Sequence, residues 1–129
     1  DKTQRVAVVY CDITGLKHVN DTQGHEAGDA LILNSCECLR QVFDGCGLFR
    51  IGGDELLVIC PDVTNAAAED WVVRLRETTK DYSVNLAVGM VYMEELGDNL
   101  ERSVIEAEKR MYDDKAEYYK KSGIERRRR

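Results

Sequence analysis

The chain has 129 residues, which is enough to bury one hydrophobic core but leaves little room for a second, so we expect a single domain. Its 43% hydrophobic and 33% charged residues are ordinary for a globular fold, and its net charge of −6 argues against a nucleic-acid-binding surface, which normally carries a basic face. The sequence holds no apolar run near the ~20 residues of a membrane span and opens without a secretory signal, which predicts a cytoplasmic domain with no membrane segment.

The first half of the chain is predicted to form a strand, a helix and a hairpin. Residues 6–13 are a nearly continuous β-branched run, typical of a strand that is buried on both faces. Apolar residues then recur at helical spacing over 29–43, which predicts an amphipathic helix. Two short apolar runs at 48–51 and 56–60, separated by a Gly-Gly turn, predict the hairpin.

The second half is predicted to form a helix, a strand and a further helix. Thr64 is expected to cap a helix over 65–79, and alternating apolar residues over 82–93 predict a strand. A last helix is expected from Asn99 to about Lys121. This order predicts an α+β fold of the ferredoxin-like βαββαβ type, with a mainly antiparallel sheet flanked by helices and an extra C-terminal helix.

This topology predicts that three carboxylates converge at one edge of the sheet. The first strand, which ends near Asp12, is expected to lie antiparallel to the third strand, which starts near Asp54 and Glu55. Like charges ~4 Å apart repel by ~4 kcal/mol at an effective dielectric of 20, so such a cluster needs a compensating charge. A cation that prefers oxygen ligands, Mg²⁺ or Mn²⁺, would supply it. The alternative is that GGDE at 52–55 forms only a hairpin turn.

We assign no functional role to the cysteines or to the basic end of the chain. The cysteine spacing suits no usual zinc site, so we expect free thiols. The basic run at 126–129 is interpreted as a solvated tail. The five cysteines are Cys11, Cys36, Cys38, Cys46 and Cys60.

Two polar segments resemble the GGDEF domain of diguanylate cyclases: DITGLKHVNDTQGHEAGD at 12–29 and RIGGDEL at 50–56. The resemblance extends from about Val6 to Gly123. It implies a nucleotide-cyclase palm and a reaction that condenses two GTP molecules into cyclic di-GMP and pyrophosphate in bacterial second-messenger signalling. Because each site of the family holds one GTP, it also implies a catalytic homodimer about a two-fold axis.

The resemblance implies a metal site and a catalytic group. Asp12 and Asp54 are expected to bind Mg²⁺ through their side chains, and Ile13 through its backbone carbonyl. Asp54 is also the expected proton acceptor for the attacking hydroxyl, and Glu55 is assigned a supporting metal-binding or orienting role. Lys17 corresponds to the lysine that meets the phosphates, with a solvated helix residue as the alternative.

The resemblance also implies substrate contacts. Asn20 and Asp29 match the guanine-binding pair, which predicts GTP over ATP, although Asp29 could cap the following helix, either instead or as well. His25 is expected near the substrate, with a purely structural hydrogen bond as the alternative. Lys115 resembles the lysine that reaches the triphosphate from the last helix. The Gly52–Gly53 pair is expected to let the turn backbone pass close to the nucleotide.

The chain departs from the family pattern at several positions. Leu56 replaces the phenylalanine of the motif, and Tyr119 stands where an arginine is expected one turn beyond Lys115, which predicts lower triphosphate affinity. The product-inhibition motif is missing at 43–46, so feedback inhibition is not expected there. The family's leading helix is also missing, so 1–129 is expected to be one GGDEF domain of a longer protein with upstream sensory domains, either cytoplasmic or on the cytoplasmic side of a membrane-anchored sensor. The alternative is a weak or inactive domain that acts as a GTP-binding regulatory module.

Overall fold

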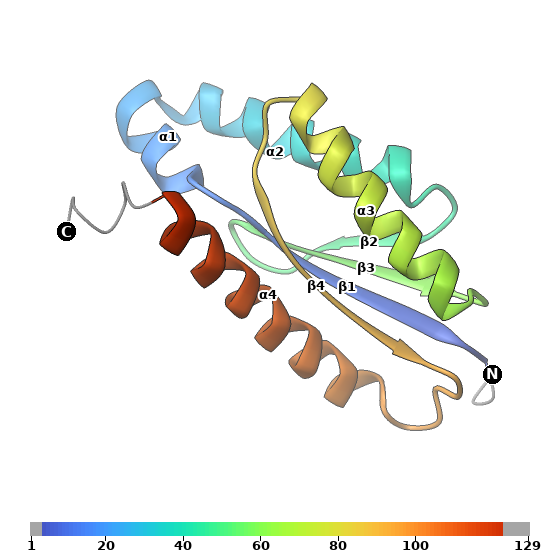
Figure 1. Cartoon of the computed structure of the whole chain (residues 1–129). Helices are drawn as coiled ribbons and strands as arrows, with labels where there is room; N and C mark the ends of the chain where they lie inside the picture. Colours follow the sequence, from blue (N-terminus) through green and yellow to red (C-terminus); the bar gives the residue numbers. More distant parts are fainter. Residues whose placement is uncertain (1–3, 123–129) are drawn as a thin grey trace.

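The computed structural model describes residues 4–122, so the basic run at 126–129 and the outermost residues of the domain expected over 1–129 lie outside it. In this part of the chain, four strands form one sheet and helices cover both of its faces (Figure 1). The elements, in chain order, are β1 (Val6–Ile13), α1 (Leu16–Gln23), α2 (His25–Val42), β2 (Gly47–Arg50), β3 (Glu55–Pro61), α3 (Asn65–Asp81), β4 (Leu86–Met93) and α4 (Leu100–Ser122).

The sheet has the order β2-β3-β1-β4, and each neighbouring pair of strands is antiparallel. β1 therefore lies between two partners, and all eight of its residues are buried. This burial on both faces is the physical reason for its continuous apolar sequence. The strand order and the helices between strands confirm the predicted α+β fold of the ferredoxin-like type, with α4 as the extra C-terminal helix.

Successive residues of β1 face opposite layers of the molecule. Val9 and the other odd-numbered residues pack with α2 and α3, against side chains such as Leu39 and Leu75. Tyr10 and the even-numbered residues before it pack in a second cluster with α4, which includes Met111. The C-terminal helix therefore forms the layer that closes the second face of the sheet.

A glycine in β4 lets α4 lie directly on the sheet. A Cβ atom at Gly89 would collide with the backbone of α4 at Ala107 and Met111. A larger residue would push the helix away from the strand. Because Lys115 lies one turn beyond Met111, this close packing also brings Lys115 to the end of β1.

The structure corrects the prediction for the segment between β1 and the first long helix. This segment contains the separate helix α1, and α2 begins at His25 rather than at residue 29. α1 has only eight residues and buries only Leu16, so its sequence is too short to show the sustained apolar period from which a helix could be predicted. Gly24, with φ of 92°, is the N-cap of α2, so the alternative that Asp29 caps this helix is wrong.

The other predicted elements are confirmed, with shifts at their ends. Thr64 caps α3 as predicted, because its hydroxyl accepts a 3.1 Å hydrogen bond from the Ala67 N–H. The fourth strand begins at Leu86 rather than at residue 82, and Ser83, with φ of 56°, lies in the intervening turn.

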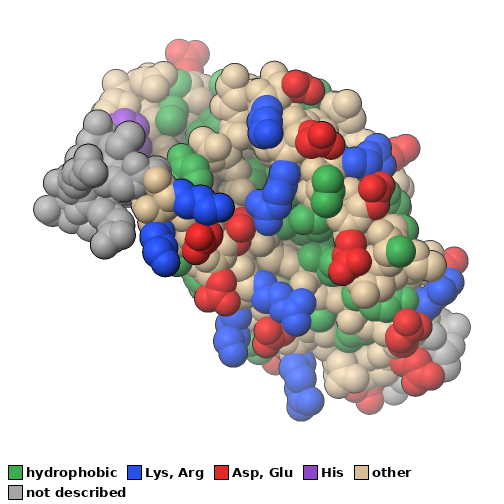
Figure 2. Space-filling model, viewed as in Figure 1, with side chains coloured by type: hydrophobic (Ala, Val, Ile, Leu, Met, Phe, Trp, Pro, Cys, Tyr) green, Lys and Arg blue, Asp and Glu red, His purple; other side chains and the backbone are tan. Residues whose placement is uncertain are grey.

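Acidic and basic side chains are interspersed on the face of the molecule in Figure 2. Some form local pairs, such as Arg76 with Asp114 at 3.3 Å and Arg110 with Glu106 at 3.4 Å. The cysteines are free thiols, as predicted. No helix within residues 4–122 combines the length and the apolar character needed to cross a membrane.

Candidate active site

Three carboxylates meet where β1 ends and β3 begins. The strand register places Asp12 directly opposite Glu55, and Asp54 precedes β3 by one residue. The Ile13 N–H donates a 2.7 Å hydrogen bond to the Asp54 carbonyl, which fixes the two backbones at this point. One carboxylate oxygen from each of Asp12, Asp54 and Glu55 lies within 4.8 Å of the others. The predicted convergence of these acids is therefore confirmed.

The surroundings of Asp12 fit a hard divalent cation. Its side chain is 4% exposed, and its Oδ1 atom has no hydrogen-bond partner among residues 4–122. Its Oδ2 atom accepts a 3.3 Å hydrogen bond from Lys115 Nζ. A buried carboxylate oxygen without a donor, beside two more carboxylates, is an arrangement that Mg²⁺ or Mn²⁺ would satisfy.

The electrostatics of the cluster agree with this geometry. Burial raises the pKa of the Asp12 carboxyl above its ordinary value; the Lys115 ammonium opposes this shift, and Asp54 and Glu55 add to it. Burial lowers the pKa of Lys115, but the Asp12 carboxylate, together with Tyr119 and Asp54, outweighs this effect, so the Lys115 pKa lies above its ordinary value. Ionised Asp12 therefore needs nearby positive charge, and in this structure Lys115 provides part of it.

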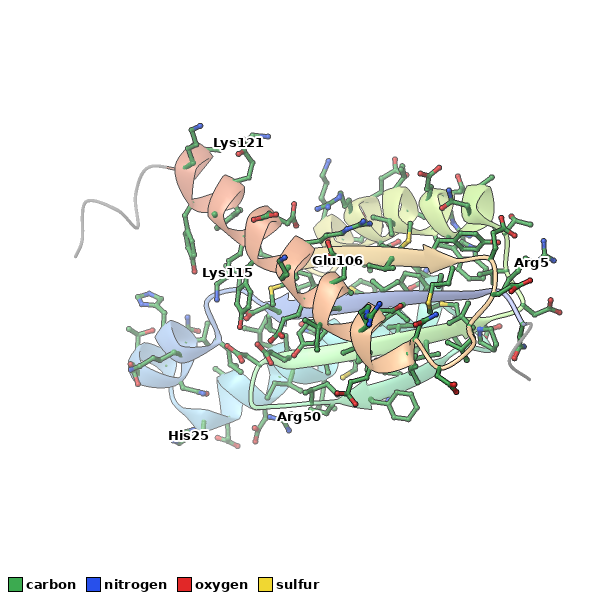
Figure 3. The ribbon with its side chains drawn as sticks, turned by 90° about the horizontal axis from the view of Figure 1, so that it is seen from below. Arg5, His25, Arg50, Glu106, Lys115 and Lys121 are labelled. Atoms are coloured by element: carbon green, nitrogen blue, oxygen red, sulfur yellow. The ribbon has the colours of Figure 1, made fainter. Side chains whose placement is uncertain are left out.

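An open cleft of about 430 Å³ lies over the acids and is bounded by β1, α1 and α4. Lys115 reaches it from α4, as Figure 3 shows. Tyr119, one turn further along α4, also lines the cleft, at the position where the resemblance to the family predicted an arginine. The predicted site residues that line this cleft are Asp12, Ile13, Lys17, Asp54 and Lys115.

Lys17 lines the cleft without contacting the acidic cluster. Its side chain is 90% exposed, and its Nζ atom lies 3.0 Å from Asp21 Oδ2, one turn further along α1. Asp21 also lines the cleft, although the sequence analysis assigned it no role. The i,i+4 spacing of the two residues was the signal for this pair.

The predicted guanine-binding residues form a separate group on α1 and α2. Asn20 of α1 packs against Gly28 of α2, where a Cβ atom would overlap the Asn20 amide. Asp29 follows Gly28 and is exposed. His25, labelled in Figure 3, lies at the start of α2, and its ring makes no hydrogen bond with the residues described here. None of Asn20, His25 and Asp29 lines the cleft over the acids.

The glycine turn is open and is held by an arginine that the sequence analysis missed. Arg50 donates hydrogen bonds to the carbonyls of Gly52 at 3.2 Å and Gly53 at 2.8 Å. A Cβ atom at Gly53 would meet nothing within 4 Å. The backbone on this side of the turn is therefore accessible to a ligand.

A tyrosine that was interpreted only as part of a buried strand contacts the acidic cluster. The Tyr10 hydroxyl donates a 2.8 Å hydrogen bond to Glu55 Oε1. Glu108 Oε2 lies 3.4 Å from this hydroxyl and also 3.4 Å from the hydroxyl of Tyr112. Burial and the contact with Glu55 raise the pKa of Tyr10. The signal for this contact was the spacing of two residues between Tyr10 and Asp12, which places both on one face of the strand.

The fold and its acidic edge define a nucleotide-cyclase-like palm domain. The family model described as "Diguanylate cyclase, GGDEF domain" matches residues 1–121, and the chain belongs to this family. The chain is similar to the Pseudomonas aeruginosa protein "Bifunctional diguanylate cyclase/cyclic di-GMP phosphodiesterase MucR", with 31% identity over 84% of the chain and 17% of MucR. It is also similar to the Escherichia coli protein "Probable diguanylate cyclase DgcE", with 35% identity over 61% of the chain and 7% of DgcE.

The fold matches that of solved GGDEF domains. The crystal structure of the GGDEF domain of DgcB from Caulobacter crescentus, in complex with c-di-GMP, superposes with a TM-score of 0.76. The match covers 88% of this chain and 73% of that chain at 20% identity. The chain spans only 7% and 17% of the length of the two curated relatives.

Proposed function

We propose that this chain is a catalytic diguanylate cyclase domain, which condenses two GTP molecules into cyclic di-GMP and pyrophosphate. The observation that carries the proposal is the meeting of Asp12, Asp54 and Glu55 at an open cleft. Membership of the GGDEF family supports the same assignment.

The acids are proposed to hold Mg²⁺ or Mn²⁺. Asp12 and Asp54 are the proposed side-chain ligands, with the Ile13 backbone carbonyl as a further ligand and Glu55 in a supporting role. The unpartnered Oδ1 atom of Asp12 favours this assignment. When bound, the cation neutralises charge that develops on the α-phosphate.

The chain's own residues then bind and orient the reactants. Asp54 accepts the proton of the ribose 3′-hydroxyl at its carboxylate, while the 3′-oxygen forms its bond to the α-phosphorus and pyrophosphate leaves. Lys17 and Lys115 line the same cleft and place positive charge near the phosphates. The open turn at Gly52–Gly53 lets the backbone approach the nucleotide.

Guanine selection is assigned to the α1–α2 hairpin. The Asp29 carboxylate accepts hydrogen bonds from guanine N1–H and the exocyclic amine, and Asn20 supplies an amide beside it. Adenine has an acceptor at N1 and would leave these groups unpaired, so GTP is preferred over ATP. His25 is proposed to lie near the substrate, because it belongs to the same motif.

The reaction requires two copies of the domain. Each copy binds one GTP, and a two-fold arrangement lets each 3′-hydroxyl reach the α-phosphate held by the partner. We also propose that the domain belongs to a longer signalling protein with upstream sensory domains that control this encounter. The small share of its relatives' length that the chain covers supports this part of the proposal.

The direct test is product formation. Concentrated protein is incubated with GTP and Mg²⁺, and cyclic di-GMP is detected by mass spectrometry. We expect product from the wild type and from Asp70→Asn, an exposed control on α3, and a loss of at least about 100-fold in Asp54→Ala, as for removal of a general base. An unchanged rate in Asp54→Ala would remove its assigned role as the base.

A GTP-binding regulatory module is the second candidate function. The observation that favours it is Tyr119, which lines the cleft where the family has a second cation for the triphosphate. Binding of GTP with Mg²⁺ without any cyclic product, even at high protein concentration, would select this candidate.

A further inference from the structure

The Tyr10 hydroxyl contacts a clustered carboxylate, and the function proposed above gives it no role. Tyr10 lies two residues before Asp12 in β1, so both side chains lie on the face that α4 covers. In the β1–β3 register Tyr10 is opposite Leu57 and Asp12 is opposite Glu55. Glu55 is therefore the diagonal neighbour of Tyr10, and the 2.8 Å hydrogen bond joins them across the two strands.

The two side chains in this hydrogen bond differ in how much conformational freedom their surroundings leave them. Tyr10 is 4% exposed, and its ring packs in the cluster that includes Leu57, Ala107 and Met111, so the position of its hydroxyl is fixed. Glu55 is only half-buried, and glutamate is among the side chains that lose most rotamer entropy when held in one conformation. The fixed phenol therefore restricts the conformations of the more exposed Glu55 carboxylate.

The single proton of the phenol goes to Glu55. Glu108 Oε2 is also near the Tyr10 hydroxyl, but at 3.4 Å against 2.8 Å for Glu55 Oε1. A neutral phenol donates one hydrogen bond, so the two carboxylates cannot share it equally. The Tyr112 hydroxyl, 3.4 Å from the same Glu108 oxygen, offers Glu108 a donor of its own.

We propose that Tyr10 is a positioning residue for divalent-cation binding, whose hydroxyl holds the Glu55 carboxylate beside Asp12 and Asp54 before a cation binds. This inference rests on the function proposed for the cleft. A ligand that is already ordered loses less entropy on binding. Removal of groups that hydrogen-bond to metal ligands typically costs 10–100-fold in metal affinity, and for this single hydroxyl we expect about tenfold.

The test measures Mn²⁺ affinity directly, with the full chain and without nucleotide. Tyr10→Phe keeps the packed ring and removes only the hydroxyl, and Tyr112→Phe is the matched control, because its hydroxyl contacts Glu108 alone among the hydrogen bonds found in residues 4–122. Free Mn²⁺ is followed by electron paramagnetic resonance. We expect the dissociation constant to rise about tenfold in Tyr10→Phe and to stay unchanged in Tyr112→Phe.

Two further measurements separate positioning from a structural effect. The Mg²⁺ concentration that gives the half-maximal cyclase rate should rise in Tyr10→Phe, and excess Mg²⁺ should restore the rate. In a Glu55→Gln background, Tyr10→Phe should no longer change Mn²⁺ affinity, because its effect passes through Glu55.

The outcomes distinguish this inference from the proposed function. Wild-type Mn²⁺ affinity in Tyr10→Phe would overturn the role of Tyr10 and leave the cyclase proposal standing. An equal loss in Tyr112→Phe, or a rate that excess Mg²⁺ does not restore, would also overturn it. A wild-type protein that binds no Mn²⁺ at all would overturn both the inference and the proposed metal site.

Discussion

At the scale of single residues, Asp12 is the most constrained group of the candidate site. It ends a strand that is buried along its whole length, and its Oδ1 atom has no donor within residues 4–122. Lys115 contacts only the other carboxylate oxygen. Lys115 therefore compensates only part of the charge of the buried Asp12 carboxylate, and a bound cation would compensate the rest.

The raised pKa of Asp12 predicts a specific dependence of stability on pH. A folded-state pKa above the unfolded one means that the folded protein holds the proton more tightly. This contribution to stability is complete below the ordinary aspartate pKa of ~3.9 and is lost as pH rises through the raised pKa. Without metal, Asp12→Asn should therefore gain stability relative to the wild type as pH rises across this window, as measured by urea unfolding with a chelator.

Added Mg²⁺ should reverse this difference, because a metal ligand must be deprotonated. Stabilisation of the wild type by Mg²⁺ should grow with pH over the same window, and Asp12→Asn should show little stabilisation. Parallel stability curves for the two proteins, with and without Mg²⁺, would contradict the assignment of Asp12.

At the scale of elements, α1 and α2 pack against each other, and their buried residues also join the core on one face of the sheet. A buried glycine, Gly28, lets the two helices approach, and Asn20 packs directly over it. The hairpin is joined to β1 at a residue with φ of 84°, Gly15, a backbone conformation that favours glycine. The candidate base-recognition residues therefore lie on the two helices, whereas the acids lie at the ends of β1 and β3.

Gly28→Ala should impair guanine binding with little effect on folding. The added Cβ overlaps the end of a flexible side chain, so the Asn20 amide moves while the helix gains about 1 kcal/mol of propensity from alanine. We expect stability within ~1 kcal/mol of the wild type and about tenfold weaker binding of a non-hydrolysable GTP analogue by calorimetry, the loss of one hydrogen bond. Asn20→Ala should give the same loss, and the double variant no further loss; additive losses would separate the two positions.

Thr64→Ala should destabilise the domain by about 1 kcal/mol, because the N-cap hydrogen bond to the Ala67 N–H disappears. Thermal unfolding would measure the loss, and Thr64→Ser should recover most of it. Equal stability of the alanine and serine variants would show that the cap contributes nothing.

The sequence predicted those parts of the fold whose residues have a clear period. The β-branched run of β1, the Gly-Gly hairpin and the cap at Thr64 all have local causes, and together they predicted the meeting of Asp12 with Glu55. The helix α1 was missed because it buries only Leu16. The contact of Tyr10 was missed because its spacing from Asp12 indicates only a shared face of the strand and not which group its hydroxyl meets.

At the scale of the whole molecule, the cleft is open rather than enclosed by the chain. Residues of β1, α1 and α4 line the cleft over the acids. Lys115 approaches the acids from the face of the sheet opposite to α2 and α3. An open site of this kind leaves room for a second copy to supply the other nucleotide, as the proposed function requires.

Cyclase activity should therefore depend on protein concentration. If two copies must meet, activity per protomer falls on dilution, and fusion of a dimeric coiled coil to the N-terminus should restore it at low concentration. Initial rates over a 100-fold range of protein concentration would measure this. A constant activity per protomer over that range, at concentrations where sedimentation finds only monomer, would contradict the two-copy reaction.

The close contact between β4 and α4 at Gly89 has a consequence for redesign of the domain. The helix that carries Lys115 cannot be lifted without disturbing the strand beside Asp12, so the chemistry proposed for the cleft and the stability of the fold depend on the same contact. The exposed residues of the α1–α2 hairpin, such as Asp29, are outside this contact, whereas its buried residues, such as Leu16 and Leu39, belong to the core. An engineer who wants a different nucleobase should diversify the exposed positions of the hairpin and leave its buried face, the sheet and the C-terminal helix untouched.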